Sequence, residues 1–434
     1  MIYHPVVDRF AMPIPLDPWS AALFVALFVA AALVTARRPA YGLCGLVVAM
    51  PFALYREVLG TTVTLPKVVL LGVLLGLTTY AGGANRLRDR PMPLLLSVLA
   101  IYLAITALSV VDAVHRGATA RETLKLVEYA ALFIAAYLCF RLDGDDRAIA
   151  GAIAVAAILV SLSALAQEIV GAPSGLYVGK AIVPRIAGVL EGPNQLAGYF
   201  QIAIATLGAW ALARRSMLND VALGLATCAD VLTFSRAGLF GLAIVGAILL
   251  VAGGRAAARA LRPAYIGLIA GIGVVGWWAV YAHTVNVLRV SLESSAYAGG
   301  VGNRGELWGA AWRMWLRHPL LGVGAGNYEL ELPRYGVFGV RTHANSWFLQ
   351  SLAEGGIALF AATLALIAAI VATFARNFRR DLGSPWVLAA FAASVALVLH
   401  QVADYLVFYP KVGGAWWLLL GIGAAAIARR RQQA

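Results

Sequence analysis

The sequence predicts an all-α polytopic membrane protein with about 12 (12–13) transmembrane helices, each about 20 apolar residues long. Hydrophobic residues make up 61% of the 434 residues and charged residues only 13%. A water-soluble fold of this size needs about twice that charged fraction to cover its core. Long apolar runs alternate with short basic clusters along the whole chain, so residues 1–434 form a single integral membrane domain.

The apolar runs define the expected helices in order, and two of them are ambiguous. The run 41–55 is short, and the last two runs are separated only around Pro410. The candidate spans are 19–36, 41–55, 66–82, 93–113, 123–140, 147–170, 195–213, 217–233, 237–253, 264–283, 346–374, 386–408 and 412–428.

The basic clusters give the expected orientation, because cytoplasmic loops carry an excess of Lys and Arg. Consecutive clusters are separated by two candidate spans, so all of them can face the cytoplasm together, with the C-terminus inside. The side of the N-terminus stays open. The clusters are Arg86/Arg88/Arg90, Arg141/Arg147, Arg214/Arg215, Arg255/Arg259/Arg262, Arg376/Arg379/Arg380 and Arg429/Arg430/Arg431. The segments expected to face outward are 114–121, 171–194, 234–236 and 284–345.

The same clustering explains the net charge of +13. In a soluble protein this excess would indicate nucleic-acid binding. Here it sits between apolar runs and fits anionic membrane lipids, so we expect lipid partners and no nucleic acid.

The outward segment 284–345 is the one long loop, and it is expected to carry short interfacial helices. Asn303 and Glu306 have the spacing of a capping box at the start of a helix, and Pro319 ends that helix. Within it three tryptophans share one helical face, with basic residues placed for lipid head groups, which is typical of a helix lying on the bilayer. The tryptophans are Trp308, Trp312 and Trp315, and the basic residues are Arg304, Arg313 and Arg317.

Four polar groups from separate outward segments fall near one membrane face: Arg185, Arg236, Arg304 and His343. Arginine presents a rigid fork of donors that suits a phosphate or pyrophosphate. A helix beginning near Asn345 would keep His343 neutral and able to accept a proton, and would itself favour an anion. Each residue alone has an ordinary explanation, such as a contact with a lipid head group. Their position at the same membrane face favours a common binding site.

Two further features qualify this site. Asp230 lies in a span, where a carboxylate is costly unless paired, so an ion pair with Arg236 competes with phosphate binding. Gln350 and Glu354 follow His343 on one helical face and are expected to line the interior below it. No metal-ligand cluster or nucleotide-phosphate loop is evident, so we expect neither a metal nor a nucleotide cofactor. The pair Asp143 and Asp145 lies on the predicted inner side and is expected to be a solvated loop.

These residues resemble the motifs of the O-antigen ligases, within the bacterial ligase and polymerase group of membrane glycosyltransferases. The resemblance covers most of the chain in architecture and about 180–360 in motif. Its carriers are Arg185-Ile-Ala-Gly188, Gly192-Pro-Asn194, Phe234-Ser-Arg236, Asn303-Arg304, His318-Pro-Leu-Leu-Gly-Val-Gly324, His343-Ala-Asn345 and Leu352-Ala-Glu354-Gly-Gly.

The resemblance implies transfer of a glycan from undecaprenyl pyrophosphate to a lipid A–core sugar hydroxyl. The reaction would occur at the periplasmic face of the bacterial inner membrane, which makes 284–345 a periplasmic loop. It implies His343, Arg236 and Arg304 as catalytic residues. The residues expected to bind the pyrophosphate or substrate are Arg185, Arg236, Arg304, Asn194, Asn345 and Arg341. With no nucleophilic carboxylate evident outside, a single inverting displacement is expected, with His343 as general base.

Three alternatives stay open at this point. An O-antigen polymerase would use the same arginines with another lipid-linked glycan as acceptor. A protein O-oligosaccharyltransferase shares the motif region but usually carries an extra soluble domain, whereas only Arg429–Ala434 follow the last span. A lipid-anion transporter would bind through the same arginines without chemistry.

Overall fold

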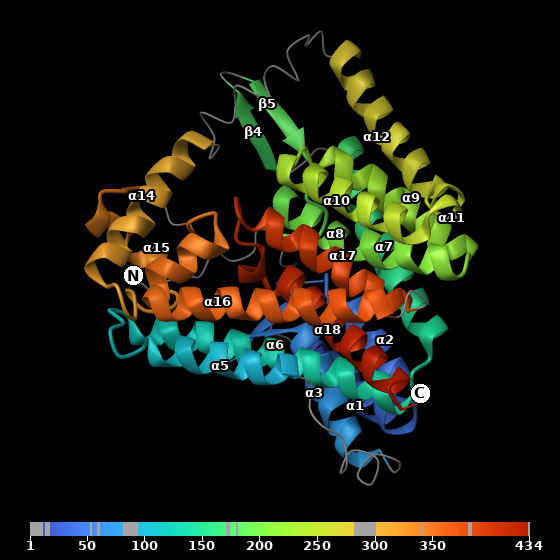
Figure 1. The fold of residues 1–434 in the computed structure, drawn as a ribbon, viewed down its shortest axis with the longest axis horizontal. Coiled ribbons are helices and arrows are strands. Elements are labelled where there is room, and N and C mark those ends of the chain that lie inside the picture. Colours follow the sequence, from blue (N-terminus) through green and yellow to red (C-terminus); the bar gives the residue numbers. More distant parts are fainter. Residues whose placement is uncertain are drawn as a thin grey trace.

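A computed structural model describes residues 12–13, 18–52, 54–58, 61–80, 94–170, 174–178, 181–281, 301–339, 342–380 and 384–432. Helices dominate it, as expected for an all-α membrane protein (Figure 1). The helices of the N-terminal half are α1 (Pro18–Arg37), α2 (Pro39–Ala49), α3 (Leu65–Thr79), α5 (Leu94–Leu108), α6 (Arg116–Leu142) and α7 (Asp146–Val170). The later helices are α8 (Pro193–Ala213), α9 (Met217–Leu232), α10 (Arg236–Gly253), α11 (Arg255–Ala260), α12 (Arg262–Tyr281), α14 (Val301–Arg317), α15 (Tyr328–Glu331), α16 (Trp347–Arg380), α17 (Pro385–His400) and α18 (Pro410–Arg430), with 3-10 turns η2 (Leu332–Tyr335) and η3 (Leu406–Phe408).

Seven of the described helices are long and apolar enough to cross a membrane: α1, α6, α7, α8, α10, α16 and α18. Shorter apolar helices are α2, α3, α5, α17 and the first part of α12. Large apolar side chains stay exposed on the outer helices, such as Leu23 and Leu33 on α1 and Ile269 on α12. Such a surface is suited to hydrocarbon and not to water. The chain is therefore a multi-pass helical membrane protein, whereas the predicted count of 12–13 spans is not confirmed.

Two predicted spans are wrong at their boundaries. The run 41–55 contains only the 11-residue α2, which rises about 16 Å and is too short to cross the bilayer. Pro51 follows α2, and the chain then pairs as a strand. The run 386–408 contains α17, which ends at His400, and residues 401–409 form a loop with one 3-10 turn.

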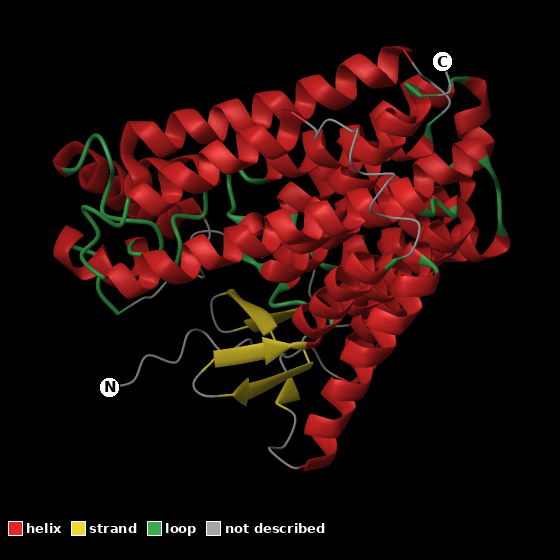
Figure 2. Ribbon diagram, turned by 90° about the horizontal axis from the view of Figure 1, so that it is seen from below, coloured by secondary structure: helices red, strands yellow, loops and turns green. Residues whose placement is uncertain are grey.

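Short strands accompany the helices on one side of the bundle (Figure 2). β1 (Met12–Pro13) pairs parallel to β2 (Leu54–Val58), which pairs antiparallel to β3 (Thr61–Thr64) with Tyr55 opposite Thr64. β4 (Ser174–Val178) and β5 (Ala181–Arg185) form an antiparallel hairpin with Ser174 opposite Arg185. The hairpin lies in the predicted outward segment 171–194 and delivers Arg185 to the start of α8.

The core is formed where α8, α17 and α18 pack together and against α6 and α10. α16 runs between α5 on one side and α17 on the other (Figure 1). Along α8, 17 residues from Gln195 to Ala211 are all buried, so this helix lies at the centre of the bundle. The N-termini of α8, α10, α16 and α18 all lie at the predicted outer end, and they carry the candidate site.

Candidate functional site

The guanidinium of Arg185 is fixed where β5 meets two other segments. Its Nε donates to the carbonyl oxygen of Thr233 at 2.7 Å, and Nη2 donates to Oδ1 of Asn194 at 3.0 Å. Nδ2 of Asn194 then donates to Oδ2 of Asp404 at 2.7 Å. Three segments far apart in sequence thus meet in one chain of hydrogen bonds. The structure brings together Arg185 and Asn194, as the sequence predicts, and adds Asp404.

The turn between α9 and α10 presents Arg236. Phe234 has φ +51°, a left-handed conformation that is uncommon for a bulky residue. Strained backbone conformations of this kind occur mainly at functional sites. Ser235 then caps α10 by accepting from the amide of Gly238 at 3.1 Å. Arg236 is the first residue of α10 and is exposed, with no hydrogen bond or ion pair to the described residues. Its charge is therefore presented at the surface of the site.

The competing ion pair between Asp230 and Arg236 does not form in the described part of the chain. Asp230 is fully buried, and neither carboxylate oxygen has a hydrogen-bond partner there. The helix α9 turns this side chain into the bundle, whereas Arg236 starts the next helix and faces outward. The expected competition for Arg236 is thus absent among the described residues.

His343 lies immediately before α16 and is 5% exposed. Its Nδ1 accepts from the amide of Asn345 at 3.2 Å, and Nε2 lies 2.9 Å from the hydroxyl of Tyr409. Because Nδ1 accepts, the neutral ring carries its proton on Nε2 and donates it to Tyr409. Asn345 itself has φ +48°, a conformation that Asn tolerates better than most residues. The remaining basic lone pair of His343 is therefore on Nδ1.

The first turns of α16 hold this segment in place. The helix begins at Trp347, close to the predicted start near Asn345. Oε1 of Gln350 accepts from the amide of Ala344 at 2.7 Å, and Nε2 of Gln350 donates to Glu354 at 2.8 Å. Gln350 and Glu354 are both buried below His343, as predicted from their spacing. Gln350 thus holds the backbone next to His343, and Glu354 holds Gln350.

The helix α16 is interrupted at Gly356, where φ is +59°. The loop after α14 enters this break: the amides of Val323 and Gly324 donate to the carbonyls of Ala353 and Glu354 at 3.0 and 2.9 Å. In return, the amide of Ile357 donates to the carbonyl of Pro319 at 2.9 Å. The two glycine-containing motifs 318–324 and 352–356 are thus one structural unit, which ties α14 to the start of α16.

Arg304 comes from α14, which packs on α16 through Leu307, Ala310, Ala311 and Met314. Arg304 is half-buried, and its Nε has no hydrogen-bond partner among the described residues. The predicted helix is present, with Trp312 on its exposed side and 49% accessible, and its position on the bilayer stays a prediction. The helix starts at Val301, so Asn303 lies inside it and the predicted capping box is wrong.

Two basic residues of α14 also differ from expectation. Nη2 of Arg313 donates to the carbonyl of Tyr335 at 2.6 Å, and the guanidinium of Arg317 lies 5.2 Å from the centre of the Tyr335 ring. Both arginines therefore fasten the segment after α15 in addition to any contact with head groups. Arg341 lies outside the described residues.

The charges of the site act on one another. Burial lowers the pKa of Arg185 to about 10; Asp404 opposes this shift, and the charges of Arg236 and Arg304 add to it. Burial also lowers the pKa of His343 below its usual 6.5; Asp404 again opposes the shift, while Lys125 and Arg304 add to it. Arg185 is therefore charged and His343 neutral at pH 7. The cations surround one place, and an anion there would relieve their mutual repulsion.

Sequence reasoning missed Asp404, Tyr409 and Lys125. The first was hidden inside the predicted span 386–408, although a carboxylate in an apolar run is itself a signal of function. Nζ of Lys125 donates to the carbonyl of Phe408 at 3.2 Å and lies 4.3 Å from the centre of its ring. The Phe408 ring is in turn 5.6 Å from the ring of His343. No sequence signal relates Lys125 to His343.

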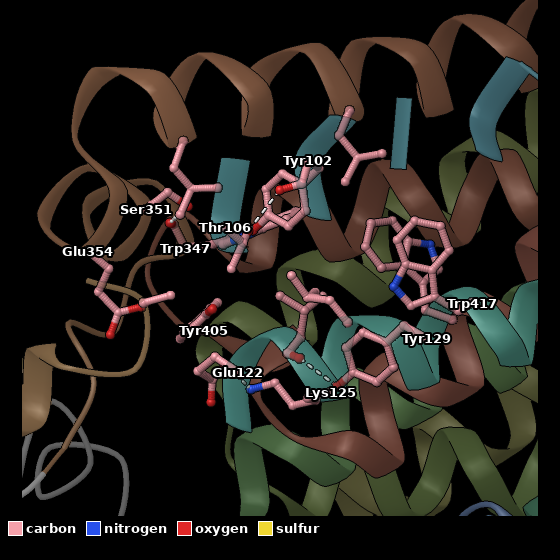
Figure 3. A pocket seen from close by; sticks show the side chains of 16 residues that line it. Tyr102, Thr106, Glu122, Lys125, Tyr129, Trp347, Ser351, Glu354, Tyr405 and Trp417 are labelled. Atoms are coloured by element: carbon pink, nitrogen blue, oxygen red, sulfur yellow. Dashed lines mark hydrogen bonds and ion pairs between the residues drawn. The ribbon is translucent and has the colours of Figure 1, made fainter. Parts of the chain in front are cut away.

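A small cavity with some polar lining residues lies beside the site and has a volume of about 30 Å³. Figure 3 shows Glu354 and Glu122 towards one end of it and Tyr129 and Trp417 towards the other. Tyr405 also lines it, and the ring of Tyr405 lies 5.8 Å from that of His343. This volume suits about one or two water molecules. It is too small for a sugar.

The structure also bears on metal binding. In the described part of the chain, no group of three His, Cys, Asp or Glu side chains is placed to hold a metal ion. The expectation of a reaction without metal or nucleotide stays a prediction.

Comparison with known families supports the sequence motifs. A family model described as O-antigen ligase matches residues 221–364, which include Arg236, Arg304 and His343 but not Arg185 or Asn194. No curated protein matches the chain. The match indicates a glycosyltransferase-like enzyme of the ligase or polymerase type, acting on lipid-linked glycans in lipopolysaccharide synthesis. Over residues 221–364 the chain is similar to the O-antigen ligase family, and the resemblance predicted from its motifs is confirmed.

Proposed function

We propose that this protein is an O-antigen ligase that transfers a glycan from undecaprenyl pyrophosphate to a sugar hydroxyl of lipid A–core. The observation that carries the proposal is the meeting of Arg185, Arg236, Arg304 and His343 around Asp404, at one end of the bundle. In the predicted orientation this end faces the periplasm of a bacterium and the C-terminus is cytoplasmic.

The arginines divide into two kinds of donor. Arg185 is held by Thr233 and Asn194, so it supplies a fixed positive charge. Arg236 and Arg304 have no partner among the described residues, and their forks suit the oxygens of a pyrophosphate. As the glycosidic bond breaks, negative charge grows on the leaving pyrophosphate, and the three arginines stabilise it. Asn345 and Arg341 are further proposed contacts to the substrate.

His343 is the proposed general base. The acceptor hydroxyl takes the place of the Asn345 amide at Nδ1 and passes its proton there as the oxygen attacks the anomeric carbon. Tyr409 holds Nε2–H, so that the ring keeps the correct tautomer, the role of the third group in other nucleophile–base pairs. The oxygen–carbon bond forms as the bond to pyrophosphate breaks, so the anomeric centre inverts. The step requires no metal.

The function is tested in cells that lack the chromosomal gene. The measurements are a gel of lipopolysaccharide and the level of glycan on its lipid carrier. A ligase predicts loss of the whole ladder, with polymerised glycan accumulating on the carrier. A band of core plus one repeat would instead make the protein a polymerase, and an unchanged ladder would reject both and favour lipid-anion transport.

The role of His343 is tested by complementing the same cells with His343→Ala. We expect transfer to fall by about 10²–10⁴-fold with binding of the lipid-linked donor intact, since a general base contributes about this much. The matched control is His115→Gln, an exposed histidine on the same side of the molecule. Full activity of His343→Ala would reject the proposed base.

A further inference from the structure

A second and larger cavity lies at the opposite end of the helices that carry the candidate site. Its volume is about 660 Å³, within the range of ligand pockets. The ends of α8, α10 and α18 and the start of α17 border it. Since α8 has 21 residues, the two ends of the bundle are about 31 Å apart. The cavity is thus separate from the site described above.

The wall of this cavity is aromatic and apolar. The rings of Trp210 and Trp386 are 5.3 Å apart, and Phe140 packs edge-on against Trp386 at 5.7 Å. Leu212 and Leu388 extend the wall. A wall of this kind favours hydrocarbon chains and disfavours a small hydrophilic ion.

The rim is basic. Arg214, Arg429 and Arg430 line the cavity together with one carboxylate, Asp146. The carboxylate is engaged, because its Oδ1 accepts from Nε1 of Trp386 at 2.7 Å. With three arginines against one aspartate, the rim carries a net positive charge.

One polar group in the wall lacks a partner. Trp210 is only 6% exposed, and its Nε1 has no hydrogen bond to any described residue. The ring of Trp210 lines the cavity, but its Nε1 atom is itself buried and offers no donor to an occupant. The wall therefore favours apolar chains.

We propose that the cavity binds an anionic phospholipid of the adjacent leaflet, which is the cytoplasmic one in the predicted orientation. The phosphate would sit among Arg214, Arg429 and Arg430, and the acyl chains would lie on the aromatic wall. The occupant is a lipid and not a free phosphate, because an aromatic and aliphatic wall adjoins the arginines inside the same cavity. The cavity is at the end of the spans, where head groups lie.

The test uses the full-length protein purified in mild detergent and titrated with phosphatidylglycerol, with bound lipid counted by native mass spectrometry. We expect the wild-type protein to hold one phosphatidylglycerol. The double variant Arg214→Gln/Arg430→Gln should bind it about 30-fold more weakly, from the usual contribution of two arginines at an anionic lipid surface.

The matched control is Arg255→Gln/Arg259→Gln, which removes the same charge at the same end from exposed positions outside the cavity. It should bind phosphatidylglycerol within about twofold of wild type. Equal weakening in the two double variants would overturn the proposal, because it would mean general attraction to the basic surface.

Two further measurements distinguish a lipid phosphate from a free phosphate. Phosphatidylcholine should bind at least about tenfold more weakly than phosphatidylglycerol, and inorganic phosphate should not displace the bound lipid. Displacement by inorganic phosphate would reject the lipid in favour of a simple anion site. If the arginine variants fail to fold, Ala252→Phe fills the cavity without changing charge and should abolish the bound lipid; retention of lipid in this variant would place it elsewhere.

Discussion

The two ends of the central helices both carry arginines, but the surroundings of the arginines differ between the ends. At the outer end Arg236 is exposed, but beside it Arg185, Asn194 and Asp404 form a continuous chain of hydrogen bonds, and His343 is fixed through both ring nitrogens. At the inner end Arg214 is exposed on the rim of a large cavity with an aromatic wall. A reaction needs groups held in one geometry. Attraction of a lipid needs only charge beside an apolar surface. The difference predicts chemistry at the first end and binding at the second.

The largest effects are expected from substitutions of the outer arginines, which test whether this end carries out chemistry. Arg236→Gln and Arg304→Gln should each lower kcat/KM for glycan transfer by about 10²–10³-fold, as for other groups that stabilise charge developing in the transition state. Arg236→Lys keeps the charge but not the fork, and should recover only part of the loss. The measurement is transfer by the purified variants from a lipid-linked donor.

A matched control for these variants is Arg334→Gln, on the same side of the molecule. Its side chain is 64% exposed and pairs with Glu331 at 2.9 Å. Exposed pairs contribute little, so activity should stay within about twofold. Equal losses in Arg334→Gln and Arg236→Gln would remove the special role given to Arg236.

A second prediction concerns the break in α16 that supports His343. At Gly356 a side chain would have a left-handed backbone and would contact the carbonyl of Leu320. Gly356→Ala should lower the free energy of unfolding by about 2 kcal/mol or more. Gly273→Ala in α12 adds a methyl group where no atom lies within 4 Å, and it should change stability by less than about 1 kcal/mol. Thermal denaturation in detergent compares the two, and equal melting temperatures would show that the break does not depend on glycine.

A third prediction uses the protonation of His343. Because only the neutral ring can accept a proton and its pKa lies below 6.5, kcat/KM should hold as the pH falls to about 6.5 and decline below that. Lys125→Gln removes a charge that lowers this pKa, so the decline should start at higher pH. Asp404→Asn removes a charge that raises it, so the decline should start at lower pH. Shifts in the same direction would contradict the assignment of this limb to His343.

The smallest effect is expected from variants at the inner end, and it tests whether the inner cavity acts independently of the outer site. Arg214→Gln/Arg430→Gln should leave the transfer rate in detergent within about twofold of wild type, since distant sites without shared partners act independently. The measurement is the same transfer assay as for Arg236→Gln. A tenfold loss would show that the inner cavity and the outer site are coupled.

Much of the site can be predicted from the sequence, and the residues that cannot be predicted have identifiable physical reasons. Arg185, Arg236, Arg304 and His343 are placed at one end of the bundle by counting apolar runs and basic clusters, and helical spacing places Gln350 and Glu354 below His343. The predicted span 386–408 conceals Asp404, because an apolar run does not reveal that α17 ends at His400 and is followed by a loop. The capping box at Asn303 is wrong because α14 already starts at Val301, and a capping residue stands before the first helical turn.

The sequence by itself determines that this protein is a helical membrane protein with cations gathered towards one face, since composition and the spacing of charges are local properties that a bilayer selects. Only the tertiary structure decides which of those cations are held and which have no partner among the described residues. The partners of Arg185 and His343 come from segments as far away as Asp404 and Tyr409, and their distances depend on how separate helices pack. The inner cavity has the same origin, because its wall and rim come from several different helices.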